Sequence, residues 1–548
     1  MVYTRWKSVY TKGVELRTEV LILGGGTSAV SAALSLADLG VKCIVVEETD
    51  WVGGQLTAQA VPSDEHIWIE QFGSTGRYRE FRNRLRAYYK TNYPLSARSK
   101  ADPFLNPGAG YVSPICAEPG VIHDVLRSML APHVANGSVT ILLEHEIESV
   151  TKSGDRIIGA RVLDKTTGKS CDIEAKIFIE ATETGEVLAL ADIEYVVGFE
   201  SKEMTGEPSA PDTYQPGNIQ AFSACFAMSY DKDSDRTIDK PNNYEYWRNF
   251  KMPFYDQNWV SWHSIEPRSL KEIIFNFDPL PVLDPLTVRA NQKDNPGSAN
   301  LWTFRRILAA SHMEHPEKFT DISLVNWPQL DYINGSIIDV SKEEKAKNIA
   351  SAKEQSLSLL YWMQTEAPRK DGKTGWPGLY LRNDVVGTKD GLAKHVYVRE
   401  ARRIKALYTV TEQDISYAIR GDAGAKKYND SVGVGHYRID LHPSTAGDNY
   451  LDVASCPYQI PVSSMIPVAT ENLIAAGKSI GTTHITNGCF RLHPTEWNIG
   501  ESAGVLAALS IRSGKSPHAF ASGKDLNDLQ AQLLHQGVEL EWPTVAPY

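Results

Sequence analysis

A glycine-rich segment near the N-terminus carries the clearest chemical signal in this sequence. Gly24-Gly25-Gly26-Thr27-Ser28-Ala29 fits the pattern G-x-G-x-x-A. In that pattern the first glycine permits a tight turn, the second lets the backbone approach a pyrophosphate, and the small last residue keeps a helix close to a strand. Glu47 follows at the distance of an acid that accepts hydrogen bonds from ribose hydroxyls. Together these residues predict a site for a dinucleotide.

Side chains able to accept a proton occur in two other places. His66 closes the segment Pro62-Ser63-Asp64-Glu65-His66, and His484 and His493 flank Arg491 near the C-terminus. A neutral imidazole is suited to general-base catalysis near neutral pH, whereas a carboxylate needs a raised pKa or serves to orient a histidine. We expect His66 to be the base, with His484 and His493 as alternatives and Asp64 and Glu65 in supporting roles. A purely structural role for each histidine stays open.

The elements that position these residues follow from the apolar pattern. Residues 20–23 and 43–46 are short apolar runs typical of buried parallel strands, and 28–39 has helical spacing between them. Further along we expect helices at 121–130, 343–363 and 500–512, strands at 139–143, 177–179 and 472–477, and a hairpin of 147–150 with 157–163.

This order of elements predicts an α/β fold whose nucleotide-binding domain is discontinuous in sequence. Residues 1–200 and 456–520 would form that domain. Residues 201–455, rich in aromatics and proline, would form an inserted α+β substrate domain, and 521–548 a C-terminal extension.

The fingerprint alone does not separate NAD from FAD. Gly53-Gly54, shortly after the second strand, favours FAD, and here the chain resembles the FAD-dependent oxidoreductase family of two-dinucleotide-binding-domain flavoproteins, with a glutathione-reductase-like FAD fold. The stretches that carry the resemblance read GGGTSA, WVGGQLTAQAVPSDEH, FIEATETGEVLALAD, YVREARRI and NLIAAGKSIG followed by GCFRLHPTEWNIGESAGVLAAL. Two departures are Glu183 within EATETGE and Lys478 where arginine is usual.

The resemblance implies an FAD site built from both ends of the chain. Gly53, Gly54 and Gln55 would lie against the pyrophosphate and the ring edge, and a helix beginning near Gly500 would point its N-terminus at the isoalloxazine. Arg491 would contact flavin or a substrate carboxylate. The cofactor-binding residues so implied are Gly24, Gly26, Thr27, Ser28, Ala29, Glu47, Glu48, Gly53, Gly54, Gln55, Ile147, Ala181, Thr182, Gly185, Gly477, Arg491, Gly500, Glu501, Ser502 and Ala503.

The function implied is oxidation of a C–OH or C–N bond of a small molecule by hydride transfer to FAD, as a dehydrogenase or an oxidase. The middle region holds no second G-x-G-x-x-G unit in a convincing context, which argues against a dedicated NAD(P)H domain. Two alternatives stay open. One is a flavin-dependent monooxygenase that uses an external reductant, and the other is a flavin-bearing RNA-modification or RNA-binding factor.

Composition narrows the partners. The net charge of -11 argues against nucleic acid, and the six widely spaced cysteines fit reduced thiols better than disulfides or a metal site. No run of apolar residues is long enough to span a membrane, and the N-terminal MVYTRWKSVYTKGVELR lacks the apolar stretch of a secretory signal. We therefore expect a cytoplasmic protein with a small-molecule substrate, and association with copies of itself stays open.

Overall fold

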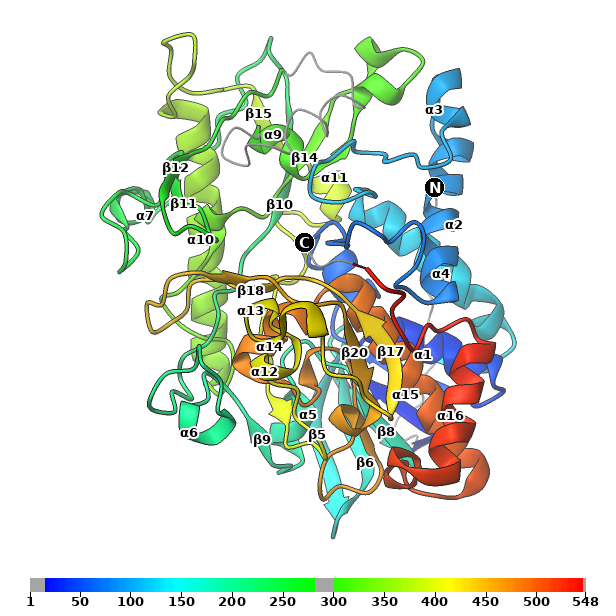
Figure 1. Cartoon of the computed structure of the whole chain (residues 1–548). Coiled ribbons are helices and arrows are strands. Elements are labelled where there is room, and N and C mark those ends of the chain that lie inside the picture. Colours follow the sequence, from blue (N-terminus) through cyan, green and yellow to red (C-terminus); the bar gives the residue numbers. More distant parts are fainter. Residues whose placement is uncertain (1–14, 281–299, 546–548) are drawn as a thin grey trace.

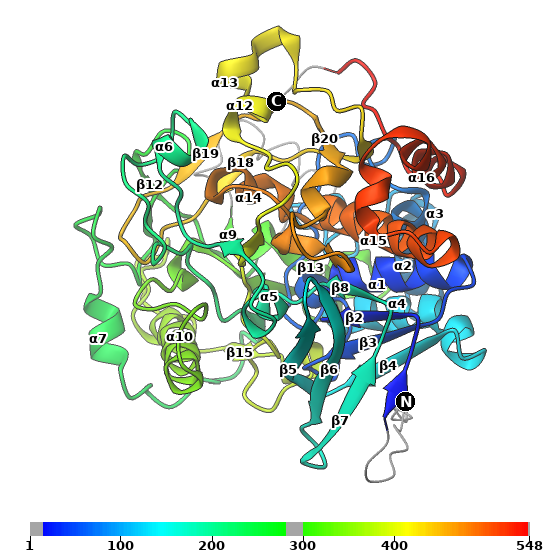
Figure 2. The same ribbon diagram turned by 90° about the horizontal axis from the view of Figure 1, so that it is seen from below.

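A five-stranded parallel sheet is the central element of the computed structural model, which describes residues 15–280 and 300–545. Its strand order is β21-β8-β2-β3-β4, with all neighbours parallel. The strands are β2 (Val20–Leu23), β3 (Cys43–Glu47), β4 (Val139–Leu143), β8 (Ile177–Glu180) and β21 (Leu473–Ala475). Helices cover the sheet, as Figure 2 shows. The expected α/β fold of a Rossmann-like nucleotide-binding unit is confirmed, and the N-terminal segment before residue 15 lies outside the described residues.

Two helices from opposite ends of the chain pack tightly on one another. They are α1 (Thr27–Asp38) and α15 (His493–Ser513), which lie side by side in Figure 2. Glycines on α15 permit this approach, because a Cβ on Gly500 would lie 2.1 Å from the Ser28 carbonyl oxygen. The expected start of this helix near Gly500 is wrong. The helix begins at His493, where Pro494 in the first turn has its φ angle already fixed for a helix.

A second, smaller sheet lies beside the parallel one and contains the expected hairpin. Its order is β1-β7-β6-β5, from β1 (Leu16–Arg17), β5 (His145–Ser153), β6 (Arg156–Asp164) and β7 (Lys169–Glu174). β5 and β6 form the expected hairpin, and Ser153 pairs with Arg156 on the two sides of its turn.

The middle of the chain forms an antiparallel sheet with its own hydrophobic core. The sheet order is β13-β14-β10-β15, from β10 (Phe226–Tyr230), β13 (Arg306–Leu308), β14 (Ile322–Val325) and β15 (Leu379–Leu381). The long helix α10 (Lys342–Thr365) lies along this part of the molecule, as Figure 1 shows. Buried tryptophans, among them Trp247, Trp302 and Trp362, fill the core.

The hydrophobic core around the parallel sheet also includes the C-terminal helix α16 (Gly523–His535), which packs through Leu526, Leu529 and Leu533. None of the described helices is both long and apolar enough to cross a bilayer. All six cysteines are free thiols. The remaining helices and strands are α2 (Gly76–Asn92), α3 (Ala97–Ala101), α4 (Pro119–Ala135), α5 (Glu186–Leu190), β9 (Tyr195–Val196), α6 (Lys202–Thr205), α7 (Tyr244–Asn249), β11 (His263–Ile265), β12 (Glu272–Ile274), α9 (Leu301–Phe304), α11 (Asn383–Val386), β16 (Arg403–Ile404), α12 (Glu412–Ile415), α13 (Tyr417–Arg420), β17 (Ser431–Gly435), β18 (Ile439–Leu441), β19 (Leu451–Val453), β20 (Tyr458–Pro461) and α14 (His484–Phe490).

Candidate functional site

The turn between β2 and α1 forms a cradle of bare backbone. Gly24 has a φ angle of +103°, and a Cβ there would lie 2.1 Å from the Ala181 carbonyl oxygen, so only glycine fits. Gly53 lies against the same turn, because its N–H donates to the Gly25 carbonyl (2.8 Å) and its own carbonyl accepts from the Thr27 hydroxyl (3.0 Å). The N-terminus of α1 therefore opens onto a surface that a phosphate group can approach closely.

A partly open pocket, called the cavity below, lies beside this cradle. It joins the ends of β2, β3 and β8 to residues from the middle of the chain, among them Lys345 and His395, which the sequence did not single out. The residues predicted to bind the cofactor that line it are Gly24, Gly26, Glu47, Glu48, Gly54, Ile147, Ala181 and Thr182.

Glu47 lies at the end of β3 with its carboxylate directed at the glycine turn. It accepts hydrogen bonds from the N–H groups of Gly25 (3.0 Å) and Thr49 (2.8 Å). Burial, together with the neighbouring charge of Glu48, raises the pKa of Glu47 to about 7. A carboxyl group at the cavity wall suits the recognition of ribose hydroxyls, which remains the role expected of Glu47.

The inner end of the cradle is crowded with polar side chains. A Cβ on Gly54 would lie 2.4 Å from Glu183 Oε1, while the other oxygen of Glu183 contacts Lys478 Nζ at 2.5 Å. Glu183 Oε1, Gln55 Oε1 and Ser28 Oγ are buried and have no hydrogen-bond partner. Because buried polar atoms are normally paired, these orphans mark a place where a polar ligand belongs. The glycine backbone and the Ser28 hydroxyl suit the pyrophosphate of a dinucleotide, whereas the two orphan oxygens of Glu183 and Gln55 are acceptors and cannot pair with it.

Beyond Gln55 lies a second polar region, which we name the arginine–aspartate cluster. It consists of Asp64, Arg305, Tyr397, Asp440 and Arg491. Arg491 contacts the Tyr397 hydroxyl (2.7 Å) and Asp440 Oδ2 (3.4 Å), and Arg305 lies 3.4 Å from Asp64 Oδ1. Gln55 Nε2 donates to the Arg491 carbonyl at 3.0 Å, which joins the cluster to the cradle.

His493 connects the cluster to α15, whose first residue it is. The Asp64 N–H donates to His493 Nδ1 at 2.9 Å, while His493 Nε2 is buried without a partner. Burial first, and then the positive charges of Arg305, Lys478 and Arg491, hold the pKa of His493 well below its ordinary value. His493 is therefore a neutral imidazole at physiological pH.

Comparison with known proteins decides the family. The sequence profile described as FAD dependent oxidoreductase matches residues 19–533. The chain belongs to the FAD-dependent oxidoreductase family. Its cofactor is FAD, as the resemblance implied, and the cavity beside the cradle is lined by several of the residues implied to bind it.

Individual relatives of this FAD-dependent oxidoreductase are distant. Over 63 residues it is 43% identical to an iron-sulfur subunit of the CoB--CoM heterodisulfide reductase of Methanopyrus kandleri, a stretch of 11% of this chain and 9% of that protein. Among solved structures, the aromatic hydroxylase CabE from angucycline biosynthesis has a TM-score of 0.33 at 11% identity, over 95% of this chain and 68% of its own. A geranylgeranyl bacteriochlorophyll reductase-like protein of Thermoplasma acidophilum has a TM-score of 0.29 at 12% identity, over 96% and 85%.

His66 and Glu65 of the oxidoreductase both contact protein groups. His66 Nε2 lies 2.9 Å from the Gly73 carbonyl, while His66 Nδ1 is buried without a hydrogen-bond partner. Trp68 and Trp542 lie around the ring, and burial lowers the pKa of His66 to about 4. Glu65 pairs with Arg82 at 2.9 Å, away from the cluster. Of the segment 62–66, it is Asp64 that reaches the arginine–aspartate cluster.

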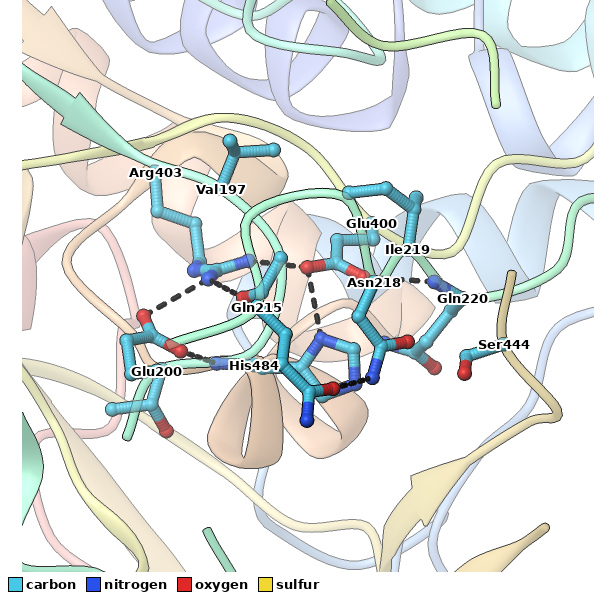
Figure 3. A network of polar contacts seen from close by, with 12 residues as sticks. Val197, Glu200, Gln215, Asn218, Ile219, Gln220, Glu400, Arg403, Ser444 and His484 are labelled. Atoms are coloured by element: carbon cyan, nitrogen blue, oxygen red, sulfur yellow. Dashed lines mark hydrogen bonds and ion pairs between the residues drawn. The ribbon is translucent and has the colours of Figure 1, made fainter. Parts of the chain in front are cut away.

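His484 belongs to a separate network, shown in Figure 3. Its Nδ1 lies 3.0 Å from Glu400 Oε1, and Arg403 pairs with both Glu400 (2.7 Å) and Glu200 (2.9 Å). Although burial would raise it, the pKa of Glu400 is lowered to about 2 by His484 and Arg403. The network ties segments near residues 200, 400 and 484 together.

Residues 500–503, which the sequence places at a helix N-terminus facing the flavin, lie in the middle of α15 and contact other protein groups. Glu501 accepts hydrogen bonds from Thr75 and Arg77 at the start of α2, and the Ser502 hydroxyl donates to the Val432 carbonyl (2.8 Å). Gly185 packs on Arg402. Arg305, Tyr397 and Asp440 were missed, because no local spacing in the sequence links them to the glycine fingerprint.

Proposed function

We propose that this enzyme oxidises a C–OH or C–N bond of a small molecule, and that the substrate lies against the arginine–aspartate cluster. The supporting observation is a buried group of charged side chains, joined through Gln55 to the glycine cradle. When bound, FAD accepts the hydride from carbon with both electrons of the C–H bond. We also propose that residues 201–455 form the substrate-bearing part, since Arg305 and Tyr397 come from it.

The proton of the hydroxyl or amine needs an acceptor within the cluster. Asp64 is 4% exposed, its carboxylate has one side-chain partner in Arg305, and burial raises the pKa of Asp64. His493 is unsuitable, because its Nδ1 already accepts a hydrogen bond and its Nε2 therefore carries the proton. We propose that Asp64 takes the proton, in place of His66, as the C=O or C=N double bond of the product forms.

Anaerobic reduction of the flavin tests the proposed reaction. Purified enzyme loaded with FAD should lose its yellow absorption when mixed with one member of a panel of alcohols and amines. Bleaching by NADH or NADPH, with no response to any alcohol or amine, would contradict direct oxidation and favour a monooxygenase.

Variants at Asp64 test the proton acceptor. Asp64→Asn should slow flavin reduction by about 100- to 10,000-fold, the usual contribution of a positioned base, with the FAD content unchanged. His66→Gln is the matched control, and its rate should stay near that of the parent. A large loss of rate in His66→Gln with little loss in Asp64→Asn would instead identify His66 as the base.

A further inference from the structure

Buried N–H groups without acceptors gather in the arginine–aspartate cluster. Nε of Arg305, Nε of Arg491 and Nε2 of His493 have no hydrogen-bond partner. Arg491 and His493 are 2% and 0% exposed, and the Arg305 side chain is 12% exposed. Arg305 lies in the turn before β13, whereas Arg491 and His493 lie at the junction of α14 and α15, so the fold brings two distant parts of the chain together.

All three groups are donors, and none can change its role. A guanidinium keeps its protons at any physiological pH. His493 Nδ1 accepts the Asp64 N–H at 2.9 Å, which places the ring proton on Nε2. Buried donors of this kind are costly unless an acceptor reaches them.

The three donors lie in one region of the molecule. Asp64 connects two of them, because its N–H donates to His493 Nδ1 (2.9 Å) and its Oδ1 lies 3.4 Å from Arg305. Arg491 precedes His493 by two residues, at the junction of α14 and α15. A single small group could therefore contact more than one of the donors.

The geometry points to a carboxylate-binding site, in which Arg305, Arg491 and His493 hold the carboxylate of the substrate. A carboxylate offers two acceptor oxygens, and charge-assisted hydrogen bonds from arginine are its strongest partners in proteins. Existing ion pairs with Asp64 and Asp440 orient the arginines and leave Nε of each free. This assignment rests on the proposed function for its reaction, and it narrows the substrate to an alcohol or amine that also carries a carboxylate.

Binding of simple carboxylates to the FAD-loaded enzyme tests the site without any turnover. The probes are acetate and glycolate, compared with acetamide and glycolamide, which have the same shape without the charge. We expect saturable binding of the acids by calorimetry, with a shift of the flavin absorption bands. We expect the amides to bind about 10- to 100-fold more weakly, as charge-assisted hydrogen bonds allow. Equal affinity for acids and amides, or no binding of either, would overturn the proposal.

Variants distinguish a substrate carboxylate from the oxygens of the flavin as the natural acceptor. Arg305→Met should lower glycolate affinity at least about tenfold while FAD stoichiometry stays at one per chain. The control is Arg248→Met, which removes a partly exposed arginine that pairs with Glu366. It should change neither the glycolate affinity nor the FAD stoichiometry. Loss of FAD from Arg305→Met with undiminished glycolate binding would assign the donors to the cofactor and overturn the proposal.

His493 provides a milder second pair of variants if Arg305→Met does not fold. His493→Gln keeps an N–H donor and should retain glycolate binding, whereas His493→Leu removes the donor and should lose it. Equal glycolate affinities in the two would contradict the site. If carboxylates bind as expected but no alcohol or amine bleaches the flavin, the proposed reaction is refuted and the carboxylate site is still supported.

Discussion

At the scale of single residues, Glu183 stands out because its carboxylate lies in the glycine cradle. One oxygen is 2.8 Å from the position of a Cβ on Gly26, where the pyrophosphate of FAD would approach. The other contacts Lys478 Nζ at 2.5 Å. Burial opposes ionisation, but Lys478 holds the pKa of Glu183 below its ordinary value, so the group is charged at neutral pH. FAD must bring two negative charges next to this one.

Glu183→Gln should therefore bind FAD more tightly. Removing one unit of like charge at this distance is worth about 1 to 2 kcal/mol, which corresponds to roughly a tenfold lower Kd. Quenching of flavin fluorescence on addition of the apoprotein measures the constant, and Glu194→Gln, an exposed acid paired with Lys405, serves as the control. Weaker FAD binding by Glu183→Gln would show instead that the carboxylate is a ligand of the cofactor.

At the scale of elements, the contact of α1 with α15 decides where both helix N-termini lie. A Cβ on Gly500 would come within 2.1 Å of Ser31 Oγ as well as of the Ser28 carbonyl, so Gly500→Ala must separate the helices. We expect a loss of about 1 to 3 kcal/mol from overpacking and weaker retention of FAD, because the start of α1 moves. Thermal unfolding and FAD stoichiometry measure these effects. Ser513→Ala, exposed at the far end of α15, should change neither, and a Gly500→Ala protein as stable as the parent would contradict this account of the packing.

The sequence predicts those elements whose signal is local. The apolar runs of β2, β3 and β8 each end within a residue or so of their predicted limits, since buried parallel strands need no partner information to be recognised. The true start of α15 has its own signals in Pro494 and Glu496, but the small-residue spacing from Gly500 onward favours a later start. Arg305 was not found for a different reason: its contact with Asp64 joins residues far apart in the chain, and only the folded structure brings them together.

At the scale of the whole molecule, an ion pair beside the cofactor cavity links the end of β3 to the middle of the chain. His395 Nε2 lies 3.1 Å from Glu48 Oε1. Burial would lower the pKa of His395, but the charge of Glu48 raises it to about 9. Burial would raise the pKa of Glu48, but the charge of His395 lowers it to about 2. The contribution of His395 to the free energy of unfolding is complete below its unfolded pKa of about 6.5 and is lost as the pH rises through 9. The contribution of Glu48 is lost as the pH falls toward 2.

His395→Gln should accordingly lower the unfolding temperature most between about pH 4.5 and 6.5. Above pH 9 the difference from the parent should shrink, because the parent histidine has then lost its charge. Thermal unfolding followed at about pH 6 and about pH 10 checks this, with the exposed His315→Gln as the control. A difference that is the same at both pH values would show that the pair contributes through packing and not through charge.

The central sheet has a consequence for synthesis of the chain. β8 is the sheet neighbour of β21, yet β21 follows β8 by more than half the length of the protein. While the ribosome is still translating the middle of the chain, the edge of β8 that β21 will cover has no partner, and α15 is not yet there to cover α1. Unpaired strand edges and exposed apolar helix faces are what chaperones bind and what aggregates form from. Expression of this oxidoreductase should therefore depend on chaperones and slow translation during synthesis, although the finished protein buries all of that surface.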